Sequence, residues 1–198
     1  MKQEYRNSGM NYILASASPR RKELLGMFIR DFTVIPANSD ETFNLSEPVE
    51  NELMRVTELK AFSVAENNHN AVIIAADTIV LKDGIVYGKP RDENDAFNTL
   101  RNLKGGVHKV MTGVCVISPS VCFKFIDETS VTFRDYDDGI IRWYLLTGEP
   151  FDRAGAYAIQ GYGCMLVSKI DGDYYNVMGL PVARLMYELN KADLFHFC

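Results

Sequence analysis

Hydrophobic residues near the start of the chain change their spacing within a few positions. Residues 12–15 form a short apolar run, whereas Leu24, Leu25 and Phe28 recur at the spacing of one helix face. The period therefore changes from about 2 to about 3.6 residues, which indicates a strand followed by a helix. Ser18 lies at the junction, where its hydroxyl can cap the helix.

A second apolar run, residues 71–81, is the most hydrophobic stretch and predicts a central strand. Asp77 interrupts this run. A carboxylate inside such a strand is costly unless it is paired, hydrogen-bonded or bound to a metal. An acid in this position is more often functional than incidental, so Asp77 is the first candidate for chemistry.

A hairpin is predicted directly after this strand, because an Asp-Gly pair at 83–84 separates two apolar runs. A two-residue turn pairs Val80 with Tyr87 and Thr78 with Lys89. The segment that carries Lys89 should then lie about one strand spacing (~5 Å) from the acid-bearing part of the strand, with Lys89 on the face of Thr78. Lys89 is either a charge that protects a sheet edge or a functional cation, and its placement favours function.

A long helix is predicted from Ser46, with Ser46 as its cap and acidic residues in its first turn. A narrow apolar stripe runs along it, made of Val49, Leu53, Val56 and Val64. Lys60 falls in the middle of that stripe. Its ammonium either extends past an apolar stem to water or points into a cleft that the core borders, and both interpretations stay open here.

The rest of the chain alternates between further predicted strands and helices. Strands are expected at residues 32–35, 107–117, 121–126 and 129–134. Helices are expected at residues 92–103 and 137–146, and a last one starts at 179–181. A final hairpin is expected from residues 164–170 and 174–177. With no internal repeat or linker visible, residues 1–198 are expected to form a single domain of two lobes flanking a cleft, preceded at residues 1–10 by a flexible extension.

Two arginines occupy an unfavourable position in the first predicted helix. Arg20 and Arg21 fall in its first turn, where the helix dipole disfavours cations. They would fit there if an anion were bound by guanidinium groups and free backbone N–H groups, with the Ser16 hydroxyl close by. The alternative is an ordinary capped helix with two solvated arginines.

Residues 149–161 form an unusual segment of small residues with few charges and no clear period. Such a segment is often a backbone that must approach a ligand closely. Gln160 within it presents both a donor and an acceptor, which reading the edge of a nucleobase requires. The same amide could equally satisfy carbonyl groups of the loop.

Composition limits the class of protein. With 47% hydrophobic and 24% charged residues, the chain of 198 residues has the composition of a soluble globular protein. A net charge of -5 argues against a general nucleic-acid binder, but it allows a small anionic ligand. The four cysteines lack metal-ligand spacing, which favours free thiols in a reducing compartment. We recognise no signal peptide, because the apolar run after Lys2 and Arg6 is too short for one. We recognise no membrane span, because Asp77 breaks the longest apolar run. We therefore predict a cytoplasmic protein.

Five motifs follow one another between residue 12 and the last predicted helix. They are LASASPRRKELL at 14–25, AADTIV at 75–80, GKPRD at 88–92, DRAGAYAIQG at 152–161 and KIDGDYYNVMGLP at 169–181. In this order they resemble the Maf (septum-formation) family of nucleoside triphosphate pyrophosphatases. One such motif would be weak, whereas five in order are specific.

The resemblance implies an α/β fold related to the inosine triphosphate pyrophosphatases, with a central mixed sheet flanked by helices and a cleft between two lobes. It implies hydrolysis of a nucleoside triphosphate to the monophosphate and pyrophosphate, assisted by Mg²⁺ or Mn²⁺. Thr78, directly after the acid, resembles the branch that acts on dTTP and UTP. The resemblance also suggests a homodimer.

Roles for single residues are carried over from the matching motifs. Asp77 matches the catalytic aspartate, which acts as proton acceptor, and together with Glu41 it is expected near the metal. Asn38 stands where relatives often carry an acid. The positions associated with base selectivity are Arg20, Thr78 and Gln160. The positions around the phosphates are Ser16, Arg21, Lys60 and Lys89.

These residue types suit attack of water on the α-phosphorus of a nucleotide. Arginine, lysine and a divalent cation neutralise charge on phosphate oxygens. One carboxylate can orient and deprotonate the water, a role worth roughly 10²–10⁴-fold. Two other functions stay open: a regulator that senses a triphosphate without hydrolysing it, which the presence of Asp77 and Lys89 disfavours, and an enzyme for modified nucleotides.

Overall fold

The computed structural model describes residues 10–44 and 46–197, so the predicted extension lies almost wholly outside the described residues. The elements follow in the order β1 (Asn11–Leu14), α1 (Pro19–Gly26), β2 (Phe32–Val34), α2 (Val49–Ala65), β3 (Ala71–Lys82), β4 (Ile85–Tyr87), α3 (Glu93–Leu103), β5 (Val107–Ile117), β6 (Cys122–Phe133), α4 (Asp138–Leu146), β7 (Val167–Asp171), α5 (Tyr174–Met178) and α6 (Val182–Lys191). Three short 3₁₀ helices lie between α4 and β7, namely η1 (Glu149–Asp152), η2 (Ala154–Ala156) and η3 (Gly161–Met165).

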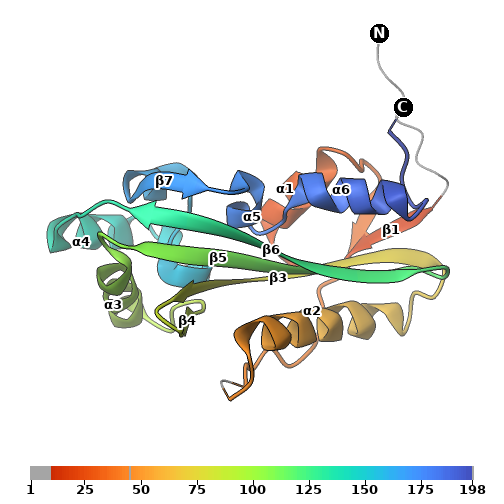
Figure 1. Ribbon diagram of the computed structural model, residues 1–198, viewed down its shortest axis with the longest axis horizontal. Helices are drawn as coiled ribbons and strands as arrows, with labels where there is room; N and C mark the ends of the chain where they lie inside the picture. The colour runs from red at the N-terminus through yellow and green to blue at the C-terminus, as the bar shows by residue number, and fades with distance from the viewer. Residues whose placement is uncertain (1–9, 45, 198) are drawn as a thin grey trace, which may run out of the picture. The chain divides into compact units, whose positions relative to one another are not determined.

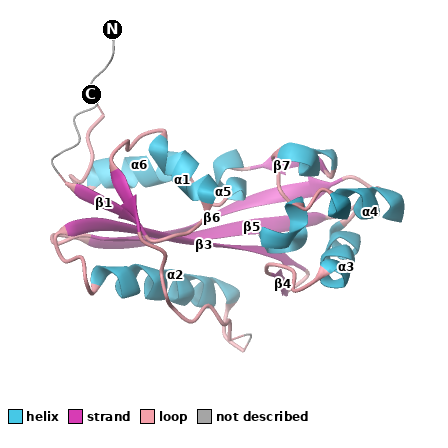
Figure 2. Cartoon of the chain, turned by 180° about the vertical axis from the view of Figure 1, so that it is seen from behind, coloured by secondary structure: helices cyan, strands magenta, loops and turns pink. Residues whose placement is uncertain are grey.

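In the described part of the chain, seven strands form one mixed sheet. Their order is β2-β1-β3-β5-β6-β7, and β4 pairs with β3. Strand β1 is parallel to both β2 and β3, whereas the β3–β4 and β6–β7 pairs are antiparallel. The predicted α/β fold, a mixed sheet with helices along it, is confirmed (Figure 2).

The chain forms two compact units. Unit 1 comprises Met1–Asp77, Gly113–Ile126 and Gly179–Cys198, and unit 2 comprises Thr78–Thr112 and Asp127–Met178. Strands β3, β5 and β6 contribute residues to both units. The predicted single domain, with two lobes around a cleft, stays a prediction.

Unit 1 is a layered structure, with α1 and α6 on one face of its strands and α2 on the other (Figure 1). Its core includes Ile13 and Ile73 from the strands and Ala61 and Val64 from α2. The predicted apolar stripe of α2 therefore packs on the sheet, and this packing sets which helix face points inward.

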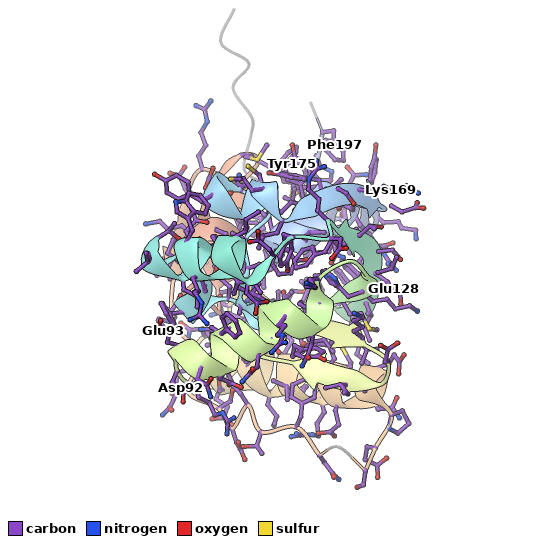
Figure 3. The ribbon with its side chains drawn as sticks, turned by 90° about the vertical axis from the view of Figure 1, so that its left-hand side faces the viewer. Asp92, Glu93, Glu128, Lys169, Tyr175 and Phe197 are labelled. Atoms are coloured by element: carbon purple, nitrogen blue, oxygen red, sulfur yellow. The ribbon has the colours of Figure 1, made fainter. Side chains whose placement is uncertain are left out.

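Unit 2 contains the predicted hairpin and the helices α3 and α4. The β3–β4 hairpin has the predicted Val80–Tyr87 pair, and its turn residues Asp83 and Gly84 have left-handed φ angles of 52° and 78°. Asp92, at the start of α3 (Figure 3), caps that helix, because its side chain accepts a hydrogen bond from the backbone N–H of Asp95 at 2.8 Å. Helices α3 and α4 contact each other. Helix α3 also contacts η1 and η2, and α4 contacts η1.

The predicted start of α2 is wrong. The helix begins at Val49, directly after Pro48, and no side chain caps it. The Ser46 hydroxyl instead donates to Asn44 Oδ1 at 2.7 Å, so it belongs to the preceding turn. Pro48 has a fixed φ and lacks an N–H, which suits a residue at the very start of a helix.

The predicted final hairpin is also wrong. Strand β7 pairs with β6 and not with the segment after the turn, which is the helix α5. Strand β6 itself runs unbroken through the two strands expected at 121–126 and 129–134. Asp173 Oδ1 accepts from the N–H of Tyr175 at 2.8 Å and starts this helix. The buried Asn176 donates to Val110 O and to Thr129 Oγ1, both at 3.0 Å. These tertiary bonds favour a helical turn over the strand that the apolar residues suggest.

Candidate active site

Lys60 is the centre of a chain of ion pairs within unit 1. Its Nζ atom lies 2.5 Å from Asp77 Oδ1 and 3.0 Å from Glu41 Oε1. Only 8% of the Lys60 side chain and 14% of the Asp77 side chain are exposed, whereas the Glu41 side chain is 59% exposed. The ammonium therefore pairs with carboxylates instead of extending to water, which decides between the two interpretations that the sequence left open.

The local sequence explains how Lys60 reaches this position. Val56 and Val64 lie four residues to either side of it, and residues at this spacing share a helix face. Both valines are buried. The apolar stripe that packs α2 on the sheet therefore carries the ammonium to the place on β3 where the apolar run is broken by Asp77.

The first turn of α1 forms a second polar group in unit 1. Ser18 caps the helix, because its hydroxyl accepts from the backbone N–H of Arg21 at 3.4 Å, as predicted. The Arg21 guanidinium donates from Nη1 to Ser16 Oγ at 3.1 Å and from Nε to Gly179 O at 2.8 Å. Arg20 precedes it in the same turn and is half-buried. The Arg21 side chain is therefore fixed by hydrogen bonds within the protein and is not simply solvated.

The two polar groups of unit 1 interact through their charges. Burial lowers the pKa of the Arg21 guanidinium, while the carboxylates of Asp77 and Glu41 oppose this effect and raise it. Arg21 consequently lies within the electrostatic field of the same acids that Lys60 contacts. The structure thus brings together Ser16, Arg21, Lys60, Asp77 and Glu41, which the sequence proposed separately.

The remaining predicted site residues, Thr78, Lys89 and Gln160, belong to unit 2. The Thr78 and Thr112 hydroxyl oxygens lie 3.0 Å apart, and Thr112 Oγ1 donates to Asn176 O at 3.2 Å. Thr112 thus links the predicted selectivity residue to α5, a connection that sequence reasoning missed. Gln160 is exposed at the start of η3.

The predicted pairing of Thr78 with Lys89 does not occur. Among the described residues, the β3–β4 ladder ends at Val80 and Tyr87. The Lys89 ammonium instead lies 2.5 Å from Asp152 Oδ1, and these two side chains are 67% and 76% exposed. The sequence analysis noted Asp152 only as one of the charges in the unusual segment at 149–161. No local pattern predicted that it pairs with Lys89.

A close backbone contact accounts for the path of the Lys89 segment. Gly155 donates its N–H to Gly88 O at 3.0 Å, which draws the chain after β4 towards the segment at 152–156. Gly155 has a φ of 69°, and a Cβ atom there would lie 2.7 Å from Val80 Cγ2. Only glycine fits both the backbone conformation and the space.

The acids of unit 1 offer a limited set of metal ligands. In the described ranges, no group of three or more His, Cys, Asp or Glu side chains is placed to hold a metal ion. Asp77 and Glu41 both contact the Lys60 ammonium, so their carboxylates converge on one point. Mg²⁺ is commonly bound by one or two carboxylates together with substrate phosphates, so the number of carboxylates here matches such a site, with the Lys60 ammonium lying between them.

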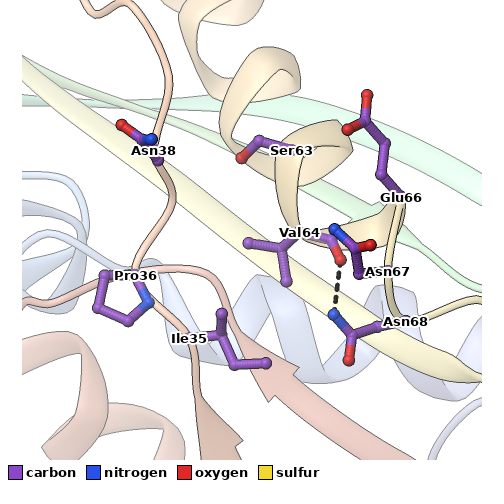
Figure 4. A pocket seen from close by; sticks show the side chains of 8 residues that line it. All are labelled: Ile35, Pro36, Asn38, Ser63, Val64, Glu66, Asn67 and Asn68. Carbon is purple, nitrogen blue, oxygen red and sulfur yellow. Dashed lines mark hydrogen bonds between the residues drawn. The ribbon is translucent and has the colours of Figure 1, made fainter.

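A pocket of about 550 Å³ lies beside the loop that leads to Glu41. It is bounded by Ile35, Pro36 and Asn38 on the loop side and by Ser63 and Val64 of α2 (Figure 4). Its walls are mainly neutral, and the site residues of unit 1 are not among those that line it. Asn38 is one of the residues that line this pocket.

The fold and the polar network define a class: an α/β protein that gathers an arginine, a lysine and two carboxylates in one unit, a set suited to a phosphate-bearing ligand. The chain belongs to the Maf family, since a family model described as "Maf-like protein" matches residues 11–192.

Curated relatives align with this chain over most of their length. A protein of Pyrococcus horikoshii named dTTP/UTP pyrophosphatase is 46% identical over 182 residues, covering 92% of this chain and 96% of that protein. Proteins with the same name from Caldicellulosiruptor bescii and Bacillus cereus are 44% and 42% identical, over 90% and 92% of this chain and 93% and 95% of those proteins.

Among solved structures, the Staphylococcus aureus Ham1 protein matches 63% of this chain and 72% of its own chain, at 15% identity and a TM-score of 0.45. Within residues 10–44 and 46–197, no helix has the length and apolar character needed to cross a membrane.

Proposed function

We propose that this chain is a nucleoside triphosphate pyrophosphatase that hydrolyses dTTP and UTP to the monophosphate and pyrophosphate. Its relatives at 42–46% identity carry the name of that activity. The observation that carries the proposal is the buried Lys60–Asp77 pair, 2.5 Å apart, in the electrostatic field of Arg21. A regulator with no chemistry to perform would gain little from an acid held in this way.

Binding of the phosphates is assigned to the cationic groups. Arg21, already oriented by Ser16 and Gly179, offers guanidinium N–H groups that match phosphate oxygens. Lys60 and Lys89 add two ammonium groups. The role proposed for each of these cations is to offset the negative charge that accumulates on the phosphate oxygens as water attacks the α-phosphorus.

Asp77 is the proposed general base. Lys60 engages its Oδ1 atom, so we assign Oδ2 as the atom that accepts the proton of the attacking water. The water then attacks the α-phosphorus, the bond to the bridging oxygen breaks, and pyrophosphate leaves. Orientation by a fixed carboxylate should contribute roughly 10²–10⁴-fold.

A divalent cation would be held by Asp77 and Glu41 together with phosphate oxygens of the substrate. When bound, Mg²⁺ or Mn²⁺ supplies further neutralisation of phosphate charge. The chain's own contribution is to bring the two carboxylates to one point through their shared contact with Lys60.

Selectivity for the base is assigned to Arg20, Thr78 and Gln160. Gln160 is exposed and offers one donor and one acceptor, which matches the edge of thymine or uracil. The Thr78 hydroxyl is oriented by its contact with Thr112, which supports a specific contact and not a mobile one.

The test is pyrophosphate release from a panel of natural and modified nucleoside triphosphates, with Mg²⁺, Mn²⁺ or EDTA, for the wild type and for Asp77→Asn. Metal-dependent release from dTTP and UTP, lost in a folded Asp77→Asn variant, is expected. Binding without release from any triphosphate would point to the sensor. Much faster release from a modified nucleotide than from dTTP would point to a role in removing such nucleotides.

A homodimer and a cytoplasmic location complete the proposal. The family resemblance supports the first. The free cysteines Cys115, Cys122 and Cys164, which suit a reducing compartment, support the second. Light scattering coupled to gel filtration tests the dimer, and cell fractionation tests the location.

A further inference from the structure

Glu149 holds the backbone that follows Gln160. It is half-buried at the start of η1, and its carboxylate reaches across to η3. Oε1 accepts a hydrogen bond from the N–H of Tyr162 at 3.0 Å, and Oε2 accepts one from the N–H of Gly163 at 3.1 Å. A single carboxylate thus satisfies two successive N–H groups in the first turn of η3, which otherwise lack partners in the helix.

The hydrogen bonds from Glu149 replace the capping bond that the side chain of the N-cap residue would normally make. Gln160 occupies the N-cap position of η3, yet its side chain makes no cap bond. Helix caps are usually supplied by a short polar side chain at that position. Because Glu149 takes this role, the Gln160 amide is not engaged by its own helix and is exposed.

We propose that Glu149 is a positioning residue for base recognition: it fixes the backbone at Gln160 and leaves the Gln160 amide to read the edge of a pyrimidine. This inference rests on the proposed function, because it takes Gln160 as a residue that contacts the base. Glu149 itself does not touch the substrate in this scheme.

The Glu149 carboxylate packs tightly against the backbone of η3. Gly161 has a φ of 67°, and a Cβ atom there would lie 2.1 Å from Glu149 Oε1. Gly163 is equally confined, since its Cβ would lie 2.1 Å from Ala158 O. The carboxylate therefore packs directly on the backbone next to Gln160, and small movements of one are transmitted to the other.

Glu149 is itself held by its neighbours. Its N–H donates to Thr147 Oγ1 at 3.2 Å, and its carbonyl oxygen accepts from Arg153 Nε at 3.0 Å. Tyr144 supports the segment from α4, because its hydroxyl oxygen accepts from the N–H of Ala158 at 3.0 Å. The backbone around Gln160 is thus positioned from a helix, as a precise recognition site requires.

The test compares Glu149→Ala and Glu149→Gln with the matched control Glu128→Ala. Glu128, which is labelled in Figure 3, lies on β6 of the same unit. It forms an exposed ion pair with Lys109 at 2.9 Å, and the loss of such a pair is expected to matter little. For each protein, kcat/KM is measured for dTTP and for dCTP. Binding of dTTP and dCTP analogues with a methylene group between the α- and β-phosphorus is measured in parallel.

In Glu149→Ala we expect the preference for dTTP over dCTP to fall about five- to tenfold, the effect of one misplaced hydrogen bond to the base. The value of kcat at saturating dTTP should stay within about twofold, since the phosphate groups bind elsewhere. Glu149→Gln keeps the side-chain size and one acceptor oxygen, so its preference should be intermediate. Glu128→Ala should match the wild type.

Equal losses on both nucleotides, or an unchanged preference in folded Glu149→Ala and Glu149→Gln, would overturn the inference and leave the proposed function intact. If the wild type releases no pyrophosphate, the proposed hydrolysis fails. The binding preference for the two methylene analogues then still decides the role of Glu149: a wild-type preference that falls in Glu149→Ala supports it, and an unchanged or absent preference refutes it.

Discussion

Replacing Lys60 by methionine removes the ammonium of the buried ion pair while keeping a side chain of similar length. Only 8% of the Lys60 side chain and 14% of its partner Asp77 are exposed. The carboxylate left behind would lose its direct partner but keep the charge of Arg21 in its surroundings. Removing one member of a buried ion pair lowers the free energy of unfolding by about 3–5 kcal/mol. Because the pair is partly exposed and the charge of Arg21 remains, we expect a loss of about 3 kcal/mol for Lys60→Met.

The matched control is the same substitution at Lys89. Its ammonium also lies 2.5 Å from a carboxylate, that of Asp152, but the two side chains are 67% and 76% exposed. Water screens such a pair, so Lys89→Met should cost at most about 1 kcal/mol. The comparison separates the effect of burial from that of the ion-pair distance.

The assay is urea unfolding followed by far-UV circular dichroism at pH 8. Lys60→Met should lower the free energy of unfolding by about 3 kcal/mol and Lys89→Met by at most about 1 kcal/mol. Equal losses for the two variants would refute the reasoning.

Gly155→Ala should destabilise the protein by about 2–4 kcal/mol, because its φ of 69° and a valine methyl 2.7 Å from the added Cβ both oppose a side chain. Gly84→Ala, with a φ of 78° but no atom within 4 Å, should cost about 1 kcal/mol, and equal costs in urea melts would contradict this difference. Burial lowers the pKa of His108 to about 4. The unfolded chain therefore binds that proton more readily, and the free energy of unfolding should fall by up to about 3 kcal/mol as the pH drops from about 6.5 to about 4. His108→Gln should flatten this slope, and a slope equal to that of the wild type would exclude His108 as its source. Ser18→Ala should cost about 1 kcal/mol because Ser18 caps α1, whereas Ser46→Ala should cost almost nothing in thermal melts, and a larger loss from the second variant would restore Ser46 as a cap.

Local patterns were sufficient for most of the secondary structure. The hairpin turn at 83–84 follows from the preference of Asp-Gly for left-handed φ angles, and the cap at Ser18 follows from hydroxyl chemistry at a helix start. Both features depend on neighbours within a few residues. The motifs that identify the Maf family are likewise continuous stretches, so the sequence was enough to suggest the family and its chemistry.

Predictions failed where a distant contact competed with a local preference. The segment Tyr174–Met178 looks like a strand, but the buried amide of Asn176 bonds with β5 and β6 and favours a helical turn. Lys89 was expected opposite Thr78, but the backbone bond to Gly155 draws its segment away. Neither partner is close in the sequence, so no local pattern could report these contacts.

The sequence by itself determined which residues carry charge, which faces are apolar and where the turns lie, because these depend on side-chain type and short-range spacing. Only the tertiary structure decided that the Lys60 ammonium pairs with Asp77 and Glu41, and that Glu149 caps the turn after Gln160. A charged side chain takes its partner from whatever the packed core brings within hydrogen-bond distance, and burial makes that partner necessary.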